Sequence, residues 1–355
     1  MISEYSALLA RMKAVKSDLL SRETFLKLVE VKTNDEVARI LLTTAYGPYI
    51  KKHSKGEHYR REYIERALRD SFMDVYFKAL VFLPKSAAKI VKEALRRFEL
   101  ENIKLILRSR GKEDEFGLVK EDLIDLHSYS KIPFEELLNL NTIEEVAEHL
   151  RDTPYGNTLR RISESYKEEG LFAIEMGLDY EFFRRLISLT RSLPFPDQDI
   201  IHFYLGLECD MLNLLWILRA KLIHKFSDEV VFTYTLPFGH FIRDATLRRI
   251  VKINSISEMK SALEGNPWET VFEGSDHFSI STEVKMKRKF YNTVINSQLL
   301  KANPFSIAPF IETLTLKEVE VTDITTIIES KRYQLTLEEM QKYLITEIPL
   351  EVSTS

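Results

Sequence analysis

Three segments of the chain carry acids, amides and bases at matching spacing, and these side chains are the ones best placed to form a polar site. Each segment has an acid followed three residues later by an amide or a second acid, and the first two have an arginine nine residues after the acid. The candidate residues are Glu99, Asn102, Arg108, Asp210, Asn213, Arg219, Glu320 and Asp323. Two interpretations remain open, a solvated flank or a wall that faces an internal cavity or a neighbouring repeat. We adopt the second as a hypothesis because polar identity is kept in all three copies.

The residue types of common active sites are present, but they are not arranged as catalysis requires. The sequence has no GxxxxGK[ST] or GxGxxG phosphate loop, no GxSxG elbow and no HExxH pair. Asp199 and His202 form a DxxH on one helix face, which resembles half of a di-iron site, but the second motif of such a site is missing. A helical metalloenzyme using Asp199 and His202 is therefore the weakest interpretation. We predict no catalytic residue, no metal site and no cofactor.

The polar positions must be held by three long helices. Pro84, Pro194 and Pro304, about 110 residues apart, each introduce such a helix. Beside each polar set runs an apolar stripe with the helical period of about 3.6 residues, which predicts a buried seam. The stripes are Leu100/Ile103/Leu107, Met211/Leu214/Leu218 and Val321/Ile324/Ile328.

A second repeated block supports the same threefold division. Residues 25–47, 134–156 and 247–269 each contain a capping box, in which a Ser or Thr caps a short helix and a Glu three residues later reaches back. The boxes are Thr33/Glu36, Thr142/Glu145 and Ser255/Glu258, and an aromatic residue closes each block: Tyr46, Tyr155 and Trp268. We expect a first unit at 1–132, a second at 133–245, a third at 246–345 and a disordered tail at 346–355.

Composition and helical periodicity favour an all-α protein. Eleven glycines, eleven prolines and 29% charged residues suit helices, and residues 229–234 (EVVFTY) are expected to be a loop or a helix end. The net charge of −4 gives no reason to expect a nucleic-acid partner. A single cysteine, Cys209, excludes an internal disulfide. We expect no signal peptide and no membrane span, because no stretch reaches the roughly 18 uncharged apolar residues that a span needs.

Several of these segments resemble the C subunit of the archaeal and bacterial V/A-type ATPases, whose eukaryotic V-ATPase counterpart is the d subunit. The matching segments are Tyr5 with residues 10–14 and 19–20, TAYG at 44–47, NIKLILR at 102–108, DMLNLLWILRAK at 210–221 and KEVEVTDITTIIESK at 317–331. The resemblance runs from Tyr5 to near Leu344. Asp323, where the family more often has Asn, and Glu329, where the first two repeats have arginine, depart from the pattern.

The resemblance implies a funnel of three similar helical bundles around a pseudo-threefold axis. It also implies a non-catalytic rotor subunit on the cytoplasmic face of the membrane. Such a subunit binds the central-stalk subunits and the membrane proteolipid ring, and it couples ATP hydrolysis or synthesis to H⁺ or Na⁺ transport. The alternative is a cytosolic α-helical repeat adaptor that binds other proteins. Solenoid repeats of that kind are roughly 20–45 residues long, far shorter than the repeats of this chain.

Overall fold

The computed structural model describes residues 2–54, 59–109, 116–126, 129–163 and 166–347, and every regular element in this part of the chain is helical. The predicted all-α class is confirmed. The longer helices are α1 (Ile2–Ser17), α5 (Arg61–Leu80), α6 (Lys85–Ala94), α7 (Arg96–Arg108), α12 (Tyr166–Thr190), α13 (Asp197–Leu218), α17 (Ile280–Ile295) and α19 (Ala308–Arg332). The predicted disordered tail lies almost entirely outside the described residues.

Short helices connect these long ones. They are α2 (Arg22–Glu30), α3 (Asn34–Leu42), α4 (Gly47–His53), α8 (Phe116–Asp122), α9 (Phe134–Leu138), α10 (Ile143–His149), α11 (Gly156–Ser163), α14 (Asp228–Thr233), α15 (Asp244–Ile250), α16 (Ile256–Ala262), α18 (Gln298–Lys301) and α20 (Leu337–Gln341), with a π-helical turn η3 (Arg219–His224) and a 3₁₀ turn η4 (Glu269–Phe272). Residues 229–234, expected to be a loop or helix end, fall largely in α14.

The capping boxes form the starts of α3 and α10 as the sequence predicts. At α16 the Ser255 hydroxyl accepts from the Glu258 N–H, but the Glu258 carboxylate reaches the N–H of Asn254, one residue earlier than expected. These bonds satisfy the free N–H groups of a helix start, so each short helix has a fixed beginning.

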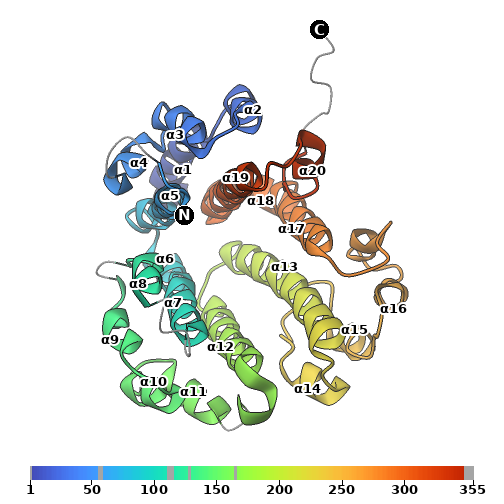
Figure 1. The fold of residues 1–355 in the computed structure, drawn as a ribbon. Helices are drawn as coiled ribbons and strands as arrows, with labels where there is room; N and C mark the ends of the chain where they lie inside the picture. Colours follow the sequence, from blue (N-terminus) through green and yellow to red (C-terminus); the bar gives the residue numbers. More distant parts are fainter. Residues whose placement is uncertain (1, 55–58, 110–115, 127–128, 164–165, 348–355) are drawn as a thin grey trace.

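The long helices surround the middle of the molecule, and the capping-box helices lie outside them (Figure 1). Helix α7 packs against α12, α13 against α17, and α19 against α5. The last of these contacts joins the two ends of the chain. A separate hydrophobic cluster contains Leu41 and Leu68 from the N-terminal part together with Ile324 and Ile328 of α19. The chain therefore closes into a ring of helices.

The predicted apolar stripes lie in the core. Ile103, Leu214, Leu218, Ile324 and Ile328 are fully buried, and Leu100 and Leu107 nearly so. Met211 and Val321 are half-buried against the same core.

Among the described residues, one helix has the length and composition of a membrane span. It runs from Asp197 to His224, and 72% of its most apolar window is buried inside the protein. Its polar residues Asp210 and Asn213 are also buried. In this fold it is a central core helix, which explains why it is apolar on most sides.

Candidate functional site: equivalent polar positions on three long helices

The acid of each repeat accepts a hydrogen bond from the aromatic residue of the following capping-box block. The bonds are Tyr155 Oη to Glu99 at 2.7 Å, Trp268 Nε1 to Asp210 at 3.1 Å and Tyr46 Oη to Glu320 at 2.6 Å. The third bond links the last long helix to the first block, across 274 residues of sequence. The three acids thus make equivalent contacts around a closed cycle.

Burial raises the pKa of three groups in these contacts, those of Tyr46, Tyr155 and Asp210. It raises the pKa of the Tyr46 and Tyr155 hydroxyls, and the neighbouring carboxylates raise it further, so both tyrosines remain hydrogen-bond donors. Burial raises the pKa of Asp210 to about 6, although backbone N–H groups of Phe241 and Ile242 and the Trp268 indole oppose the shift. Lys317 lies 3.8 Å from the centre of the Tyr46 ring and 3.1 Å from Glu320, so the third pair also has a cation beside it.

The amide positions hold a backbone segment that lies 22 or 23 residues further along the chain. Asn102 and Asn213 each make two bonds to one backbone residue, accepting from its N–H and donating to its carbonyl. The partners are Ile124 (2.8 and 2.9 Å) and Leu236 (2.8 and 2.8 Å). Asp323 has two acceptor oxygens and no donor, and it accepts from the N–H groups of Ile345 at 2.6 Å and Thr346 at 2.9 Å.

These contacts contradict the solvated-flank interpretation. Glu99, Asn102, Asp210, Asn213, Glu320 and Asp323 are all buried. Only the arginines reach solvent: the Arg108 side chain is 56% exposed and that of Arg219 42% exposed.

The two arginines form two-point ion pairs between paired helices. Arg108 on α7 binds Glu175 on α12 at 2.5 and 2.7 Å, and Arg219 binds Glu283 on α17 at 2.8 to 3.2 Å. In the third unit the charges are reversed, because Glu329 on α19 binds Arg61 on α5. The sequence shows Glu329 as a departure, but the compensating Arg61 is visible only in three dimensions.

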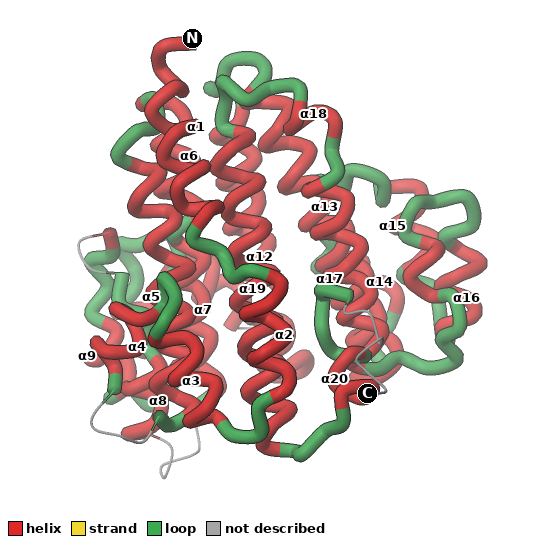
Figure 2. The backbone as a smooth tube through the Cα atoms, turned by 90° about the horizontal axis from the view of Figure 1, so that it is seen from above, coloured by secondary structure: helices red, strands yellow, loops and turns green. Residues whose placement is uncertain are grey.

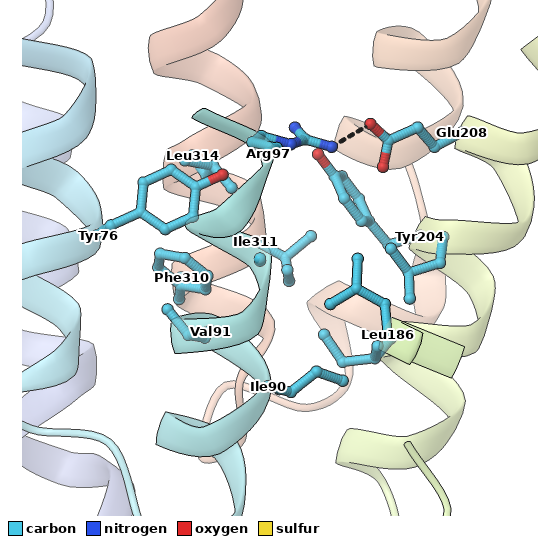
Figure 3. Close-up of a pocket in the computed structure, with 13 residues that line it drawn as sticks. Tyr76, Ile90, Val91, Arg97, Leu186, Tyr204, Glu208, Phe310, Ile311 and Leu314 are labelled. Carbon is cyan, nitrogen blue, oxygen red and sulfur yellow. Dashed lines mark hydrogen bonds and ion pairs between the residues drawn. The ribbon is translucent and has the colours of Figure 1, made fainter. Parts of the chain in front are cut away.

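A further set of equivalent residues meets near the middle of the ring. Arg97, Glu208 and Glu318 stand two residues before the acids of the three repeats, on α7, α13 and α19. Arg97 donates to Glu208 across a small cavity of about 40 Å³ (Figure 3). This set is absent from the residues predicted above, although its constant spacing from the three acids was a usable signal.

We call Arg97, Glu208 and Glu318 the axial set. Their charges affect the pKa of Glu318 and that of Arg97. Burial and the negative charge of Glu208 raise the pKa of Glu318 to about 6, against the opposing effects of Arg97 and a hydrogen bond from Tyr291. Glu208 and neighbouring tyrosines keep the pKa of Arg97 high despite burial. The rest of the cavity lining is apolar apart from Tyr76 and Tyr204. The cavity thus contains an ion pair between helices, with no nucleophile held by a base.

The Asp199 and His202 pair gains no further ligands. Both residues line a surface hollow with His240 and Arg243, and the His202 ring is bonded to the Thr190 hydroxyl. Within the described part of the chain, no group of three or more His, Cys, Asp or Glu residues is placed to hold a metal ion.

Comparison with known proteins covers nearly the whole chain. A family model described as ATP synthase (C/AC39) subunit matches residues 8–343. The chain belongs to this family. It is 28% identical to the C subunit of the A-type ATP synthase of Methanothermobacter thermautotrophicus over 91% of this chain and 83% of that protein. The corresponding protein of Archaeoglobus fulgidus is 27% identical, covering 96% of both chains, and that of Methanocaldococcus jannaschii is 25% identical, covering 97% of this chain and 87% of that protein.

Membership confirms the resemblance to the C subunit of the V/A-type ATPases and identifies the chain as one of a family of ATPase subunits connected with ion transport. The equivalent contacts of the three repeats are formed by residues that hold helices together.

Proposed function

We propose that this chain is a non-catalytic rotor subunit that couples the central stalk of a V/A-type ATPase to the membrane proteolipid ring. In this role it lies on the cytoplasmic face of the membrane and transmits rotation linked to H⁺ or Na⁺ transport. Family membership supports the proposal. The observation that carries it is the closed cycle of equivalent contacts, in which the bond from Tyr46 to Glu320 joins the beginning of the chain to its end.

A part that transmits torque must resist shear between its helices. Close-packed interiors deform little, and a closed ring has no free end at which strain can be released. In this proposal the eight polar residues singled out from the sequence act as links between structural elements. The acids and amides tie blocks and loops to the long helices, and Arg108 and Arg219 tie the long helices to their neighbours.

The three-unit funnel is part of the same proposal. Units at 1–132, 133–245 and 246–345 follow the sequence repeat, and the bonds from each acid to the next block then cross the boundaries between units. A central opening between three such units would receive the foot of the stalk.

The test is reconstitution of the complex with and without this chain. We expect the purified chain to bind both the stalk subunits and the detergent-solubilised ring, and to hydrolyse no ATP by itself. Omission should leave ATP hydrolysis by the soluble head intact and abolish the ion pumping that hydrolysis drives. Coupled pumping without the chain would overturn the proposal, and binding to proteins unrelated to the ATPase would favour the repeat adaptor.

A further inference from the structure

Exposed apolar side chains gather in the turns that lead into the proline-introduced helices. Val81 and Phe82 lie between α5 and α6, Phe195 between α12 and α13, and Phe305 between α18 and α19. Their exposed fractions are 74%, 37%, 70% and 42%. Each of the three repeats therefore presents a phenylalanine to solvent near its proline.

The three turns border one hollow of about 600 Å³, whose lining includes Phe82, Phe195 and Phe305 together with Glu4 and Tyr5 of α1. In Figure 2 this end of the molecule holds α18, the start of α6 and the N-terminus, and the described C-terminal part lies at the opposite end. We call Val81, Phe82, Phe195 and Phe305 the phenylalanine rim. A contiguous exposed apolar surface of this kind usually marks a binding site.

A buried carboxylate ties two of the three turns of the rim together, those with Phe195 and Phe305. Asp197, at the start of α13, accepts a hydrogen bond from the hydroxyl of Tyr5 and a second one, 2.9 Å long, from the N–H of Ile307. These bonds join α1, the turn before α13 and the start of α19. The turns with Phe195 and Phe305 are thus fixed to each other before a partner binds, which lowers the entropy cost of binding.

Basic side chains stand beside the apolar ones. Lys85, Arg191 and Lys301 are exposed in the same turns or at the adjoining helix ends, and among the described residues none of the three forms an ion pair. The acids nearby are Glu4 and the buried Asp197 in the hollow and Asp199 on α13. The surface offers an apolar centre with unpaired cations, which complements a partner that has both apolar and acidic groups.

We propose that the phenylalanine rim is the surface through which this chain docks on the cytoplasmic face of the proteolipid ring, with Lys85, Arg191 and Lys301 facing acidic groups of that ring. This inference rests on the proposed function. A hollow surface receives protruding protein loops, whereas insertion into a flat bilayer requires side chains that project from a convex surface. One phenylalanine from each repeat also suits a partner centred on the ring axis.

The test compares the triple variant Phe82→Ser/Phe195→Ser/Phe305→Ser with a matched control. The control, Ile223→Ser/Ile280→Ser/Tyr333→Ser, removes three apolar side chains of 60%, 65% and 65% exposure that lie away from the rim. We expect the rim variant to bind the solubilised ring at least about tenfold more weakly than the wild type, with stalk binding unchanged and a cooperative unfolding transition retained. The control should bind the ring like the wild type.

Separate results distinguish the possible failures. If the wild type does not bind the ring, the proposed function fails. If the wild type binds and the rim variant binds equally well, only the rim assignment is overturned. Binding of the wild type to ring-free vesicles with anionic lipid, lost in the rim variant, would assign the rim to lipid and overturn the ring as its partner. A Lys85→Glu/Arg191→Glu/Lys301→Glu variant should weaken ring binding several-fold, and no effect would overturn the role of the bases.

Discussion

Helices α13 and α19 occupy equivalent places in the ring, yet they hold their neighbours with different chemistry. On α13, Asn213 donates to one backbone carbonyl and accepts from one N–H, both of Leu236. On α19, Asp323 accepts from two successive N–H groups, those of Ile345 and Thr346. The loop beside α19 instead presents two N–H donors to the Asp323 carboxylate, which has no hydrogen to donate.

The ends of these helices differ in the same way. Arg219 pairs with Glu283 after α13, whereas Glu329 of α19 pairs with Arg61. In both cases the interaction is kept while the donor and acceptor roles change. The two departures from the family pattern, Asp323 and Glu329, are therefore matched to local partners.

The largest effect should come from giving α13 the chemistry of α19. In Asn213→Asp a carboxylate oxygen would face the Leu236 carbonyl in a fully buried position, and we expect a loss of about 3 kcal/mol in the free energy of unfolding at pH 7.5. The loss should shrink at pH 5, because a protonated acid can donate to that carbonyl. Urea denaturation at both pH values measures it, with exposed Asp199→Asn as the control. A loss of under about 1 kcal/mol at pH 7.5 would contradict the assigned bonding.

The axial set gives a second comparison, since α7 has a cation, Arg97, where α13 and α19 have acids. Glu318 has a pKa of about 6 in the folded protein against 4.5 normally, so folding binds its proton more tightly. The contribution of Glu318 to wild-type stability should therefore fall as the pH rises from 4.5 to 6, by up to about 2 kcal/mol.

Glu318→Gln removes this titration and keeps an acceptor for Tyr291. The variant should gain stability relative to the wild type across that pH range and hold the gain above it. Thermal or urea unfolding from pH 4 to 8 checks this, with exposed Glu338→Gln as the control. A difference between variant and wild type that does not change with pH would show that Glu318 titrates normally.

The converse of the first change should be milder. Asp323→Asn keeps one oxygen that accepts from the N–H of Ile345, but its NH₂ group would face the N–H of Thr346, so that two donors oppose each other. We expect a loss of about 1–2 kcal/mol in the free energy of unfolding. The same urea measurement applies. If Asp323→Asn costs as much as Asn213→Asp, the two loops are not specialised for different partners.

The smallest effect concerns the charge reversal. Arg108→Glu with Glu175→Arg would give α7 the polarity that α19 has. Each single variant should cost about 0.5–1 kcal/mol, because Arg108 is half exposed, and the double variant should recover most of the loss. A double-mutant cycle in low salt measures the coupling. Additive losses would mean that the pair contributes nothing measurable.

Much of the local structure could be predicted because its causes are local. The helical period of Leu100, Ile103 and Leu107 identifies a buried face without knowledge of what covers it. The bond from the N–H of Glu36 to the Thr33 hydroxyl oxygen connects residues three apart, so the start of a short helix is visible in the sequence. The different bond at α16, where the Glu258 carboxylate accepts from Asn254 and not from Ser255, was not predictable, because it depends on the path of the preceding turn.

The polar site was predictable in part. Its eight residues could be found from repetition, but their burial could not, because an acid beside an apolar stripe has the same sequence pattern whether water or a tyrosine covers it. Arg61, Glu175 and Glu283 carried no signal of their own. Each is one charged residue among many on a helix, and only the fold shows which charge it opposes.

The sequence by itself determined the all-α class, the apolar seams and the capped short helices, which follow from spacing within about one helix length. It also determined the threefold repetition, because like segments recur along the chain. Only the tertiary structure decided that the acid of each repeat meets the aromatic residue of the next block, that Glu320 reaches back to Tyr46, and that Phe82, Phe195 and Phe305 share one end of the molecule. The physical reason is chain closure. Contacts between residues hundreds of positions apart depend on how every helix in between packs, and no local sequence pattern contains that information.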